Sequence, residues 1–316
     1  MKVLYLLGRA HCGSTVVASI LDNVDTVFAA GELYILGFPD EKSKRSPCSC
    51  GELKQDCSFW QAVQHRFEAQ SVDLEWDTFR RIIHHCDKIS QAPRSLLNQK
   101  NQPLFQKYLQ GKKLLYKCIA EESGCKIIVD TGRNPFIAQF LMRNIQNFDI
   151  LYMIRNGEDY LYSKLRRIKL GQGMWFHQIQ LKPRTFFAPF MIIASCSWFY
   201  GNLLSDMIAL AYPKRVMRLR YEDFCAAPKQ TLKELGDFIG IDTESIMYKV
   251  EMQTPMPIKH IYNGNMMSRE GTFTFDPSIG MNMPIPLLYR IIFRLINWPL
   301  MLAYGYWSRP KTAPES

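Results

Sequence analysis

The sequence of 316 residues has no uninterrupted apolar run long enough to span a bilayer, although 47% of its residues are hydrophobic. It also has no RNA-binding signature, zinc-finger spacing or basic-region helix to accompany its formal net charge of +10. These absences disfavour a membrane-spanning protein and a nucleic-acid partner, and the charge indicates a basic surface or an anionic ligand. A chain of this length can bury a substantial core, so a single domain over residues 1–316 is expected.

The cysteines do not form the pattern of a disulfide scaffold, because there are nine of them and they are spread along the chain. This usage indicates a reducing compartment, and a cytoplasmic location is expected. Three thiols, Cys48, Cys50 and Cys57, lie within one short segment. A zinc site needs a fourth ligand and usually has wider spacing, so no metal is expected there. Reduced thiols and a disulfide that pins the loop are the two alternatives.

The first 21 residues have the pattern of a strand, a glycine-bounded turn and a helix. Val3–Leu7 is a short apolar run typical of a buried strand, and helical spacing begins at Ser14. Such a unit binds anions, because backbone N–H groups and the helix dipole both face the turn. The spacing Gly8-x4-Gly13-x-Thr15 is that of a Walker A loop, but Ser14 replaces its lysine. The loop therefore suits a phosphate-like group other than the ATP γ-phosphate.

Short strands alternate with helices along the rest of the chain. Further strands are expected at Thr26–Ala30, Lys126–Asp130, Phe148–Ile154 and Arg215–Arg220. Helices are expected at Ser58–Ala69, Leu74–Ser90, Asn101–Ile119, Pro135–Asn144, Tyr160–Lys169, Thr231–Ile239 and, as a long buried helix, Phe190–Tyr212. This alternation predicts an α/β fold with a parallel β-sheet flanked by helices.

Three segments depart from the alternation. Residues of about 38–120 are interpreted as a cysteine-containing loop followed by a helical insertion, and Pro255–Gly280 as a loop. Residues of about 283–307 form an apolar helical tail. Two positions are open for this tail: packed on the core, which we favour, or in peripheral contact with a membrane, with Arg290 and Arg294 at the headgroups.

Polar residues follow the predicted strands at five places, and in parallel sheets the ligand binds beyond those strand ends. The five segments are Arg9–Thr15, Glu32, Asp130–Arg133, Arg155–Asp159 and Tyr221–Asp223. Arg155 at one strand end, with Ser163 and Arg167 on one face of the next helix, forms a second anion site. The alternative for these basic side chains is a solvated helix end that complements the helix dipole.

These motifs resemble those of sulfotransferases that use 3′-phosphoadenosine 5′-phosphosulfate (PAPS). The loop Gly8–Thr15 resembles their 5′-phosphosulfate loop, and Arg155–Asp159 with Ser163 resembles their 3′-phosphate motif. Arg220–Phe224 and Asn265–Gly271 are similar to two later segments, so the resemblance covers the whole chain in order. It implies a P-loop NTPase-like three-layer fold, PAPS as donor and 3′,5′-ADP as product. No metal is expected, because a sulfuryl group carries less charge than a phosphoryl group.

The resemblance also implies roles for individual residues. The nucleotide is expected to contact Arg9, Ala10, His11, Cys12, Gly13, Ser14, Thr15, Arg155, Ser163, Arg167, Tyr221, Arg269, Gly271 and Thr272. Tyr221 has a second interpretation as an ordinary core residue. Arg9 and the loop N–H groups would stabilise the leaving oxygen. Arg133 stands where several sulfotransferases carry a lysine, and binding of the leaving phosphate, of the substrate or of neither is open.

The general base is expected to be Glu32, with His11 as the second candidate. The pair Gly31-Glu32 is similar to the base-bearing segment of tyrosylprotein sulfotransferases, which places the chain near a glutamate-base branch. The cysteine-bearing loop is similar to those of bacterial-type sulfotransferases. The alternative role for Glu32 is an ion pair with Arg9.

Two other functions remain open at this stage. One is a P-loop kinase that uses ATP-Mg²⁺ with Asp130 near the metal, which the missing loop lysine disfavours. The other is a non-catalytic nucleotide-binding module, which the presence of Glu32 disfavours. The acceptor is a hydroxyl or amine on a small molecule, lipid, carbohydrate or peptide, and the sequence does not distinguish these.

Overall fold

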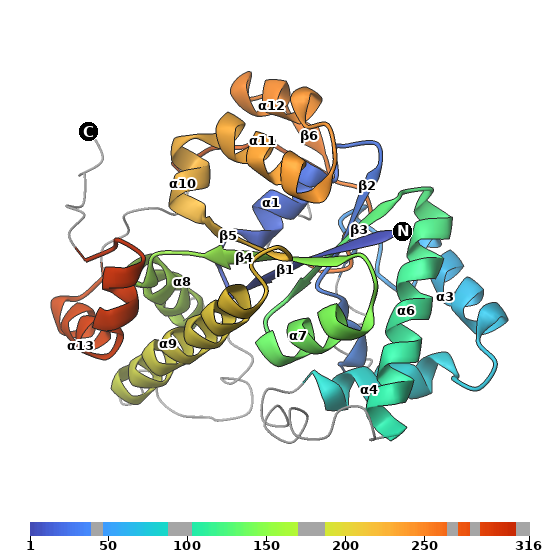
Figure 1. Cartoon of the computed structure of the whole chain (residues 1–316), viewed down its shortest axis with the longest axis horizontal. Coiled ribbons are helices and arrows are strands. Elements are labelled where there is room, and N and C mark those ends of the chain that lie inside the picture. The colour runs from blue at the N-terminus through green and yellow to red at the C-terminus, as the bar shows by residue number, and fades with distance from the viewer. Residues whose placement is uncertain (39–46, 88–102, 170–186, 264–270, 279–284, 308–316) are drawn as a thin grey trace.

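A central sheet of five parallel strands organises the protein (Figure 1). The computed structural model describes residues 1–38, 47–87, 103–169, 187–263, 271–278 and 285–307. The strand order is β2-β3-β1-β4-β5. The strands are β1 (Lys2–Gly8), β2 (Val27–Gly31), β3 (Ile127–Gly132), β4 (Phe148–Ile154) and β5 (Val216–Arg220). The predicted parallel sheet flanked by helices is therefore confirmed.

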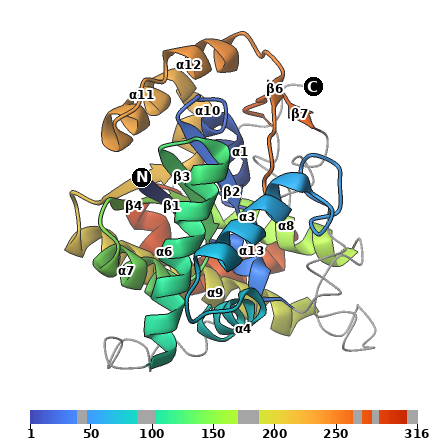
Figure 2. The same cartoon turned by 90° about the vertical axis from the view of Figure 1, so that its right-hand side faces the viewer.

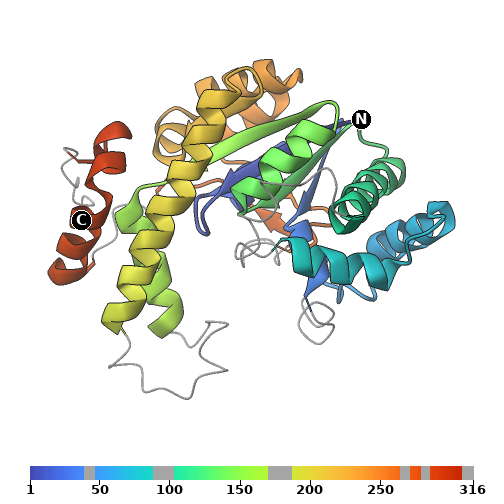
Figure 3. The ribbon, with the colours of Figure 1, turned by 60° about the horizontal axis from the view of Figure 1, so that its bottom comes forward.

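Both faces of this sheet are buried, as the near-continuous apolar strand sequences predict. Alternate residues of β1 point to opposite faces, so Val3 and Tyr5 join one hydrophobic cluster while Leu4 and Leu6 join the other. Helices α1 (Ser14–Leu21), α10 (Tyr221–Ala226), α11 (Pro228–Ile239) and α12 (Glu244–Glu251) cover one face. Helices α6 (Pro103–Ser123), α7 (Pro135–Asn144), α8 (Gly157–Lys169) and α9 (Phe187–Ala211) cover the other (Figure 3).

A group of helices lies between β2 and β3 in the sequence and beside the sheet in space (Figure 2). It contains η1 (Leu33–Gly37), α3 (Ser58–Gln70), α4 (Trp76–Cys86) and the long α6. α6 contacts both α3 and α4, and α4 contacts η1. Phe67 and Phe79 stack with ring centroids 5.1 Å apart, which joins α3 to α4. Because η1 directly follows Glu32, this helical group supports one side of the expected site.

Several predicted boundaries are wrong. β3 continues through Gly132, where a turn was expected from residue 131, and α8 begins at Gly157 rather than Tyr160. The residues after β5 form the short helix α10, and Pro255–Gly280 contains a hairpin of β6 (Met256–Pro257) and β7 (Thr272–Phe273). The helix expected to be buried, α9, exposes one apolar side, with Ile193 66% and Leu210 71% accessible. One apolar side of α9 therefore packs in the core, and the other is exposed.

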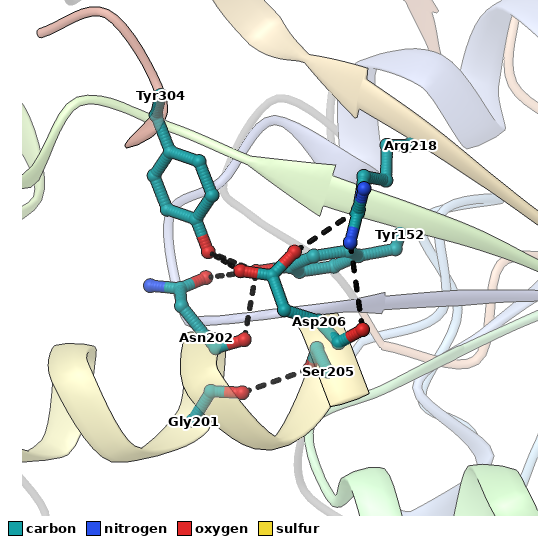
Figure 4. A network of polar contacts seen from close by, with 7 residues as sticks. All are labelled: Tyr152, Gly201, Asn202, Ser205, Asp206, Arg218 and Tyr304. Carbon is teal, nitrogen blue, oxygen red and sulfur yellow. Dashed lines mark hydrogen bonds and ion pairs between the residues drawn. The ribbon is translucent and has the colours of Figure 1, made fainter. Parts of the chain in front are cut away.

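A buried polar network fixes α9 against the sheet (Figure 4). Tyr152 on β4 donates to Asn202 Oδ1 at 2.9 Å, and its hydroxyl lies 3.0 Å from that of Tyr304. Tyr304 also donates to Asp206, whose other carboxylate oxygen lies 3.0 Å from Arg218 Nε on β5. Burial raises the pKa of Asp206, and the contacts with Tyr304 and Arg218 oppose that rise. The network therefore joins the sheet, α9 and the residue after α13.

The C-terminal helix α13 (Leu287–Ala303) packs on α9 and α8, as favoured from the sequence. Arg294 Nε lies 2.8 Å and Arg290 Nε 3.4 Å from the carboxylate of Glu158, which is 3% exposed. The two arginines thus neutralise a buried acid at the start of α8. The opposite side of α13 exposes Leu295 and Trp298. Peripheral membrane contact through that side stays a prediction; among the described helices, none has the length and hydropathy to cross a bilayer.

A second buried polar group lies between the helical group and the sheet. Lys112 Nζ is 3.0 Å from Asp130 Oδ2, and Tyr116 donates to the same oxygen at 2.6 Å. Asp87, at the end of α4, accepts a hydrogen bond from Tyr108. Burial raises the pKa of Asp87 to about 6, helped by the charge of Asp130 and opposed by Lys112. The ionised form of Asp87 therefore destabilises the fold at neutral pH.

We expect Asp87→Asn to stabilise the protein at pH 8 more than at pH 4. The pKa of Asp87 is 3.8 in the unfolded chain and about 6 in the folded protein, so below pH 3.8 the protonated side chain is compatible with the fold. As the pH rises through about 6, Asp87 ionises in its buried site and the native state loses stability. The free energy of unfolding should increase by about 2 kcal/mol more at pH 8 than at pH 4. Urea denaturation at both pH values measures it. The exposed Asp73→Asn is the control, and an equal effect at both pH values would contradict the assignment.

Candidate functional site

The carboxyl ends of all five strands lie at one edge of the sheet, because every pairing is parallel. Central β1 ends at Gly8 and leads through residues 9–13 into α1. Its neighbours β3 and β4 end just before Arg133 and Arg155, and the outer strands end just before Glu32 and Tyr221. The five polar segments predicted from the sequence therefore start from one edge, at the end of the sheet where α/β proteins bind ligands.

The turn Gly8–Thr15, called here the glycine loop, has the backbone geometry that its glycines allow. Gly13 has φ +93°, in the left-handed region that favours glycine. His11 also has a positive φ, of 66°. A Cβ on Gly13 would overlap the ring of Tyr221, so the aromatic ring packs directly on the loop. Tyr221 is only 4% exposed and belongs to a hydrophobic cluster. Its interpretation as a core residue is the one that fits this packing.

Gly13→Ala should destabilise the protein more than Gly240→Ala. Both positions have positive φ, of 93° and 78°, so both variants carry the cost of left-handed backbone, about 1 kcal/mol. Only at Gly13 does the new methyl group meet a ring, whereas Gly240 has open space. We expect an additional loss of about 1–3 kcal/mol at Gly13. Thermal denaturation of the two variants measures the difference, and equal losses would contradict the packing of Tyr221 on the loop.

The amino end of α1 is left open to an anion. Gly13 provides no side-chain cap, and the first turn of this fully described helix contains no acidic residue. Burial raises the pKa of the neighbouring Cys12 thiol, and the charges of Arg133 and Arg155 oppose that rise. Cys12 is thus a neutral, buried residue at the base of the loop. Arg133 and Arg155 therefore add positive charge near the base of the loop.

Arg155 connects the second expected anion site to the glycine loop. Its Nη1 donates to the carbonyl oxygen of His11 at 2.6 Å, and its guanidinium lies 5.2 Å from the ring centroid of Tyr221. The carbonyl of Arg155 in turn accepts from the indole of Trp198 on α9. The side chain of Arg155 thus folds back across the glycine loop, while the second anion site expected from Arg155, Ser163 and Arg167 stays a prediction.

Arg9 lies against α9 rather than beside Glu32. Its Nη2 donates to the hydroxyl of Ser197, and its aliphatic part fills the space that Gly201 leaves. Its Nε is buried and has no hydrogen-bond acceptor among the described residues. The alternative of an Arg9–Glu32 ion pair is therefore wrong. Arg9 is instead a half-buried cation beside the loop, and its buried Nε has no acceptor among the described residues.

Glu32 is paired with Arg133, whose Nη2 lies 2.5 Å from Oε1. Asn263 Nδ2 donates to the other oxygen, Oε2, at 2.7 Å, and the hydroxyl of Tyr34 donates to the same atom at 3.2 Å. The side chain of Glu32 is 15% exposed. Three contacts hold the carboxylate in one orientation, and an ionised carboxylate has about four acceptor positions, so it can accept a further proton or hydrogen bond.

Asp130 has a structural role in the buried polar group between α6 and the sheet. It lies in β3 opposite Tyr5, and one carboxylate oxygen contacts both Lys112 and Tyr116 in the buried group described above. A carboxylate that is 2% exposed and paired with a buried ammonium is poorly placed to bind Mg²⁺ at the ligand edge. The interpretation as a kinase depended on Asp130 as a residue near Mg²⁺, and this pairing removes that support.

The other residues predicted to contact the nucleotide either make contacts away from the glycine loop or lie outside the residues that the structure describes. The hydroxyl of Ser163 donates to Asp159 within its own helix. Gly271 and Thr272 are exposed on the β6–β7 hairpin, which contacts Asn23 beyond the carboxyl end of α1, away from the loop. The side chain of Arg167 and all of Arg269 lie outside the described residues. The contacts of Ala10, Ser14 and Thr15 with a nucleotide stay predictions that rest on their place in the loop.

No motif or strand pattern in the sequence indicated two of the residues that contact the site, Asn263 and Ser197. Asn263 reaches Glu32 across 231 positions, and Ser197 reaches Arg9 across 188 positions. Neither lies in a recognisable motif, and neither follows a predicted strand. Only the packing of α9 and of the segment after β6 against the sheet edge brings them to the site.

One of the solved structures that are similar to this chain supports its fold. The sulfotransferase domain of the Synechococcus PCC 7002 olefin synthase aligns over 95% of this chain and 94% of its own, with 14% identity and a TM-score of 0.51. A sulfotransferase domain from the curacin biosynthetic pathway has 17% identity over 95% and 97% of the two chains, with a TM-score of 0.48. A mouse sulfotransferase solved in complex with PAP has 14% identity over 95% of this chain and 84% of its own, with a TM-score of 0.48. No curated protein matched the sequence.

The family itself is shown by the sequence. Residues 4–245 match the sulfotransferase family. The match includes β1 and its glycine loop, Glu32, Arg133 and Arg155, so it covers most of the residues gathered at the sheet edge. The resemblance of the motifs to sulfotransferases is thus confirmed, while assignment to a glutamate-base branch stays a prediction. From its fold, its site and this match, the chain belongs to the sulfotransferase family.

Proposed function

We propose that this protein transfers the sulfuryl group of PAPS to a hydroxyl or amine acceptor. The observation that carries the proposal is the family match over residues 4–245, which includes the glycine loop at the end of β1. PAPS has two anionic ends, a 5′-phosphosulfate and a 3′-phosphate. The loop with the open end of α1 provides one group of anion ligands, and the segment that begins at Arg155 provides the other.

The 5′-phosphosulfate binds in the glycine loop. The N–H groups of the first turn of α1 face it, and the helix dipole favours its charge. Arg9 has a buried Nε with no acceptor among the described residues, and an anion in the loop would satisfy it. Arg155 holds the loop through the carbonyl of His11 and places a guanidinium charge beside it, which favours a phosphate there.

Glu32 acts as the general base. As the acceptor oxygen attacks sulfur in line, its proton passes to the Glu32 carboxylate, the bond from sulfur to the bridging oxygen breaks, and 3′,5′-ADP leaves with the electron pair. Arg9 and the loop N–H groups stabilise the charge on the leaving phosphate. Asn263 and Tyr34 are positioning residues, because they hold Oε2 of Glu32. Arg133 balances the charge of Glu32 and is close enough to Cys12 to act on the loop as well.

The acceptor belongs to one of four classes: small molecule, lipid, carbohydrate or peptide. The exposed apolar sides of α9 and α13, which include Ile193, Leu295 and Trp298, favour an apolar or membrane-associated acceptor. Lipid contact would concentrate such an acceptor at the protein. The corresponding partner is an anionic lipid surface, which the basic net charge of the chain attracts.

Transfer of labelled sulfur from PAPS tests the proposed reaction. Cell extract, fractionated into lipid, small-molecule, glycan and protein pools, is incubated with the protein and ³⁵S-labelled PAPS. We expect label in one pool and stoichiometric release of 3′,5′-ADP. Transfer of phosphate from γ-labelled ATP in the presence of Mg²⁺, with no transfer from PAPS, would instead support a kinase. A heat-denatured sample is the control for transfer by other components of the extract.

A further inference from the structure

Three cysteines and one histidine meet at a single point outside the proposed active site. Cys48, Cys50, Cys57 and His260 each offer one ligand atom, and these four atoms all lie within 4.8 Å of one another. The sequence alone offered only the three thiols. His260 is 203 positions away from Cys57, and it reaches the thiols because residues 258–263 run beside the cysteine-bearing segment.

The spacing of these atoms fits a tetrahedral zinc site. With Zn–S bonds near 2.3 Å and a Zn–N bond near 2.0 Å, tetrahedral geometry requires S···S separations of about 3.8 Å and S···N separations of about 3.6 Å. Sγ of Cys50 lies 3.7 Å from Sγ of Cys57, and Sγ of Cys57 lies 3.3 Å from Nδ1 of His260. These two separations are close to the tetrahedral values and no separation exceeds 4.8 Å, so shifts of about 1 Å would complete the coordination sphere.

The cysteine segment is folded as a tight turn that presents its thiols together. Pro47 and Leu53 form an antiparallel bridge, and the amide of Cys48 donates to the carbonyl of Glu52 at 2.7 Å. Gly51, at φ +93°, allows this reversal. The amide of Cys57 donates to the carbonyl of Leu53, which returns the chain to the cluster just before α3. Structural zinc sites likewise combine thiols from one turn with a ligand from a distant segment, and here the turn brings the thiols together although the spacing Cys48-x-Cys50 is narrower than usual.

The imidazole is held in place by surrounding contacts. Its ring stacks on Phe59 with an interplanar angle of 6° and a centroid distance of 5.1 Å. The carbonyl of His260 accepts from the indole of Trp60 at 2.9 Å. Ser49, between two of the cysteines, donates to the carbonyl of Lys259 and accepts from the amide of Ile261. These contacts fix both backbones around the cluster, so the ligands are preorganised for a metal.

From this geometry we propose that Cys48, Cys50, Cys57 and His260 bind one structural Zn²⁺. The proposal replaces the expectation that no metal binds here, which rested on a missing fourth ligand and on the narrow spacing of the thiols; His260 supplies the fourth ligand. Three sulfurs and one nitrogen fill the four positions that zinc prefers, which leaves no open position for water or substrate. The site is therefore structural, and binding releases the thiol protons of the three cysteines.

The zinc would stabilise the segment that positions Glu32. Three residues after His260, Asn263 donates to Glu32 Oε2, and its carbonyl accepts from the amide of Glu32 at 3.2 Å. Lys54, between Cys50 and Cys57, contacts Asn263 Oδ1 at 3.3 Å. One ion thus joins the segment that contains Asn263 to the segment whose Lys54 contacts it. Loss of the metal should loosen Glu32 without removing any group from the glycine loop.

Metal analysis of the intact protein tests the site. The full chain is purified under reducing conditions without a metal-affinity step and dialysed against a mild chelator, and zinc is then measured by mass spectrometry. We expect about one zinc per chain, and replacement by Co²⁺ should give the absorption of tetrahedral cobalt with thiolate ligands. Cys50→Ser changes an exposed thiol and His260→Phe preserves the stack on Phe59; both should lose the zinc. Cys196→Ser, at an exposed cysteine on α9, should retain it.

Two results would overturn the proposal. One is a protein without zinc whose Cys50 and Cys57 are joined in a disulfide, detected by alkylation and peptide mass spectrometry. The other is full zinc content in both Cys50→Ser and His260→Phe, which would place the ion elsewhere. The measurement uses no nucleotide and no turnover, so its outcome is independent of the proposed sulfuryl transfer.

Discussion

Replacement of Glu32 by glutamine should abolish turnover while 3′,5′-ADP still binds. Glutamine has the same shape and keeps an oxygen that can accept from Asn263, but it cannot accept the proton of the acceptor. Loss of a general base reduces turnover by roughly 10²–10⁴-fold. Steady-state transfer from labelled PAPS measures the rate, and calorimetry with 3′,5′-ADP measures binding.

Two variants separate the chemical role of Glu32 from its structural role. Asn263→Ala keeps the carboxylate and removes one of its supports, so its loss of turnover should be smaller than that of Glu32→Gln. Glu68→Gln, at an exposed position on α3, should leave turnover unchanged. Full activity of Glu32→Gln would remove Glu32 from the mechanism and make His11 the next candidate. Loss of 3′,5′-ADP binding in the same variant would instead indicate a role in folding of the site.

Arg155→Ala should weaken binding of 3′,5′-ADP by about 10- to 100-fold, since a charge-assisted hydrogen bond contributes roughly 1.5–3 kcal/mol. The variant loses a cation for phosphate and also the donor that holds the carbonyl of His11. Arg155→Lys should recover only part of the affinity, because an ammonium cannot donate to the loop carbonyl and a phosphate in the same planar arrangement.

The matched control for Arg155 is Arg166→Ala. Arg166 is exposed on α8, eleven positions later, so the variant removes the same charge from the same region of the chain. Calorimetric titration of 3′,5′-ADP at fixed salt compares the variants. An equal loss in Arg155→Ala and Arg166→Ala would show that only the net charge matters, which would contradict the specific contact of Arg155 with the loop.

The fold was predictable because short-range patterns specify it. Apolar runs such as Val3–Leu7 and Phe148–Ile154 alternate with helical spacing, and this combination requires a parallel sheet. The glycine loop was equally clear, since the conformations of Gly8–Gly13 depend on residues that are neighbours in the sequence. Errors occurred where tertiary contacts decide, as in α9, whose apolar sequence does not reveal that one side packs on the sheet while the other is exposed.

The partners of the site residues were not predictable to the same extent. The sequence suggested Glu32 and Arg133 as separate candidates, and only the adjacency of β2 and β3 shows that they form an ion pair. An ion pair of Arg9 with Glu32 was one alternative, but the position of α9 gives Arg9 the hydroxyl of Ser197 as a partner. His260 and Asn263 lie in a segment interpreted as a loop, with no periodicity to indicate which side chains turn inward. Contacts between distant segments depend on the packing of the whole chain, which local patterns do not encode.

Thermal denaturation with and without nucleotides tests the central claim, that the glycine loop and Arg155 bind PAPS rather than ATP. A ligand that binds only the native state stabilises it by about 2.7 kcal/mol at a hundredfold excess over its dissociation constant. We predict a higher melting temperature with 3′,5′-ADP, no shift with ATP-Mg²⁺, and loss of the 3′,5′-ADP shift in Arg155→Ala. Stabilisation by ATP-Mg²⁺ but not by 3′,5′-ADP would contradict the account.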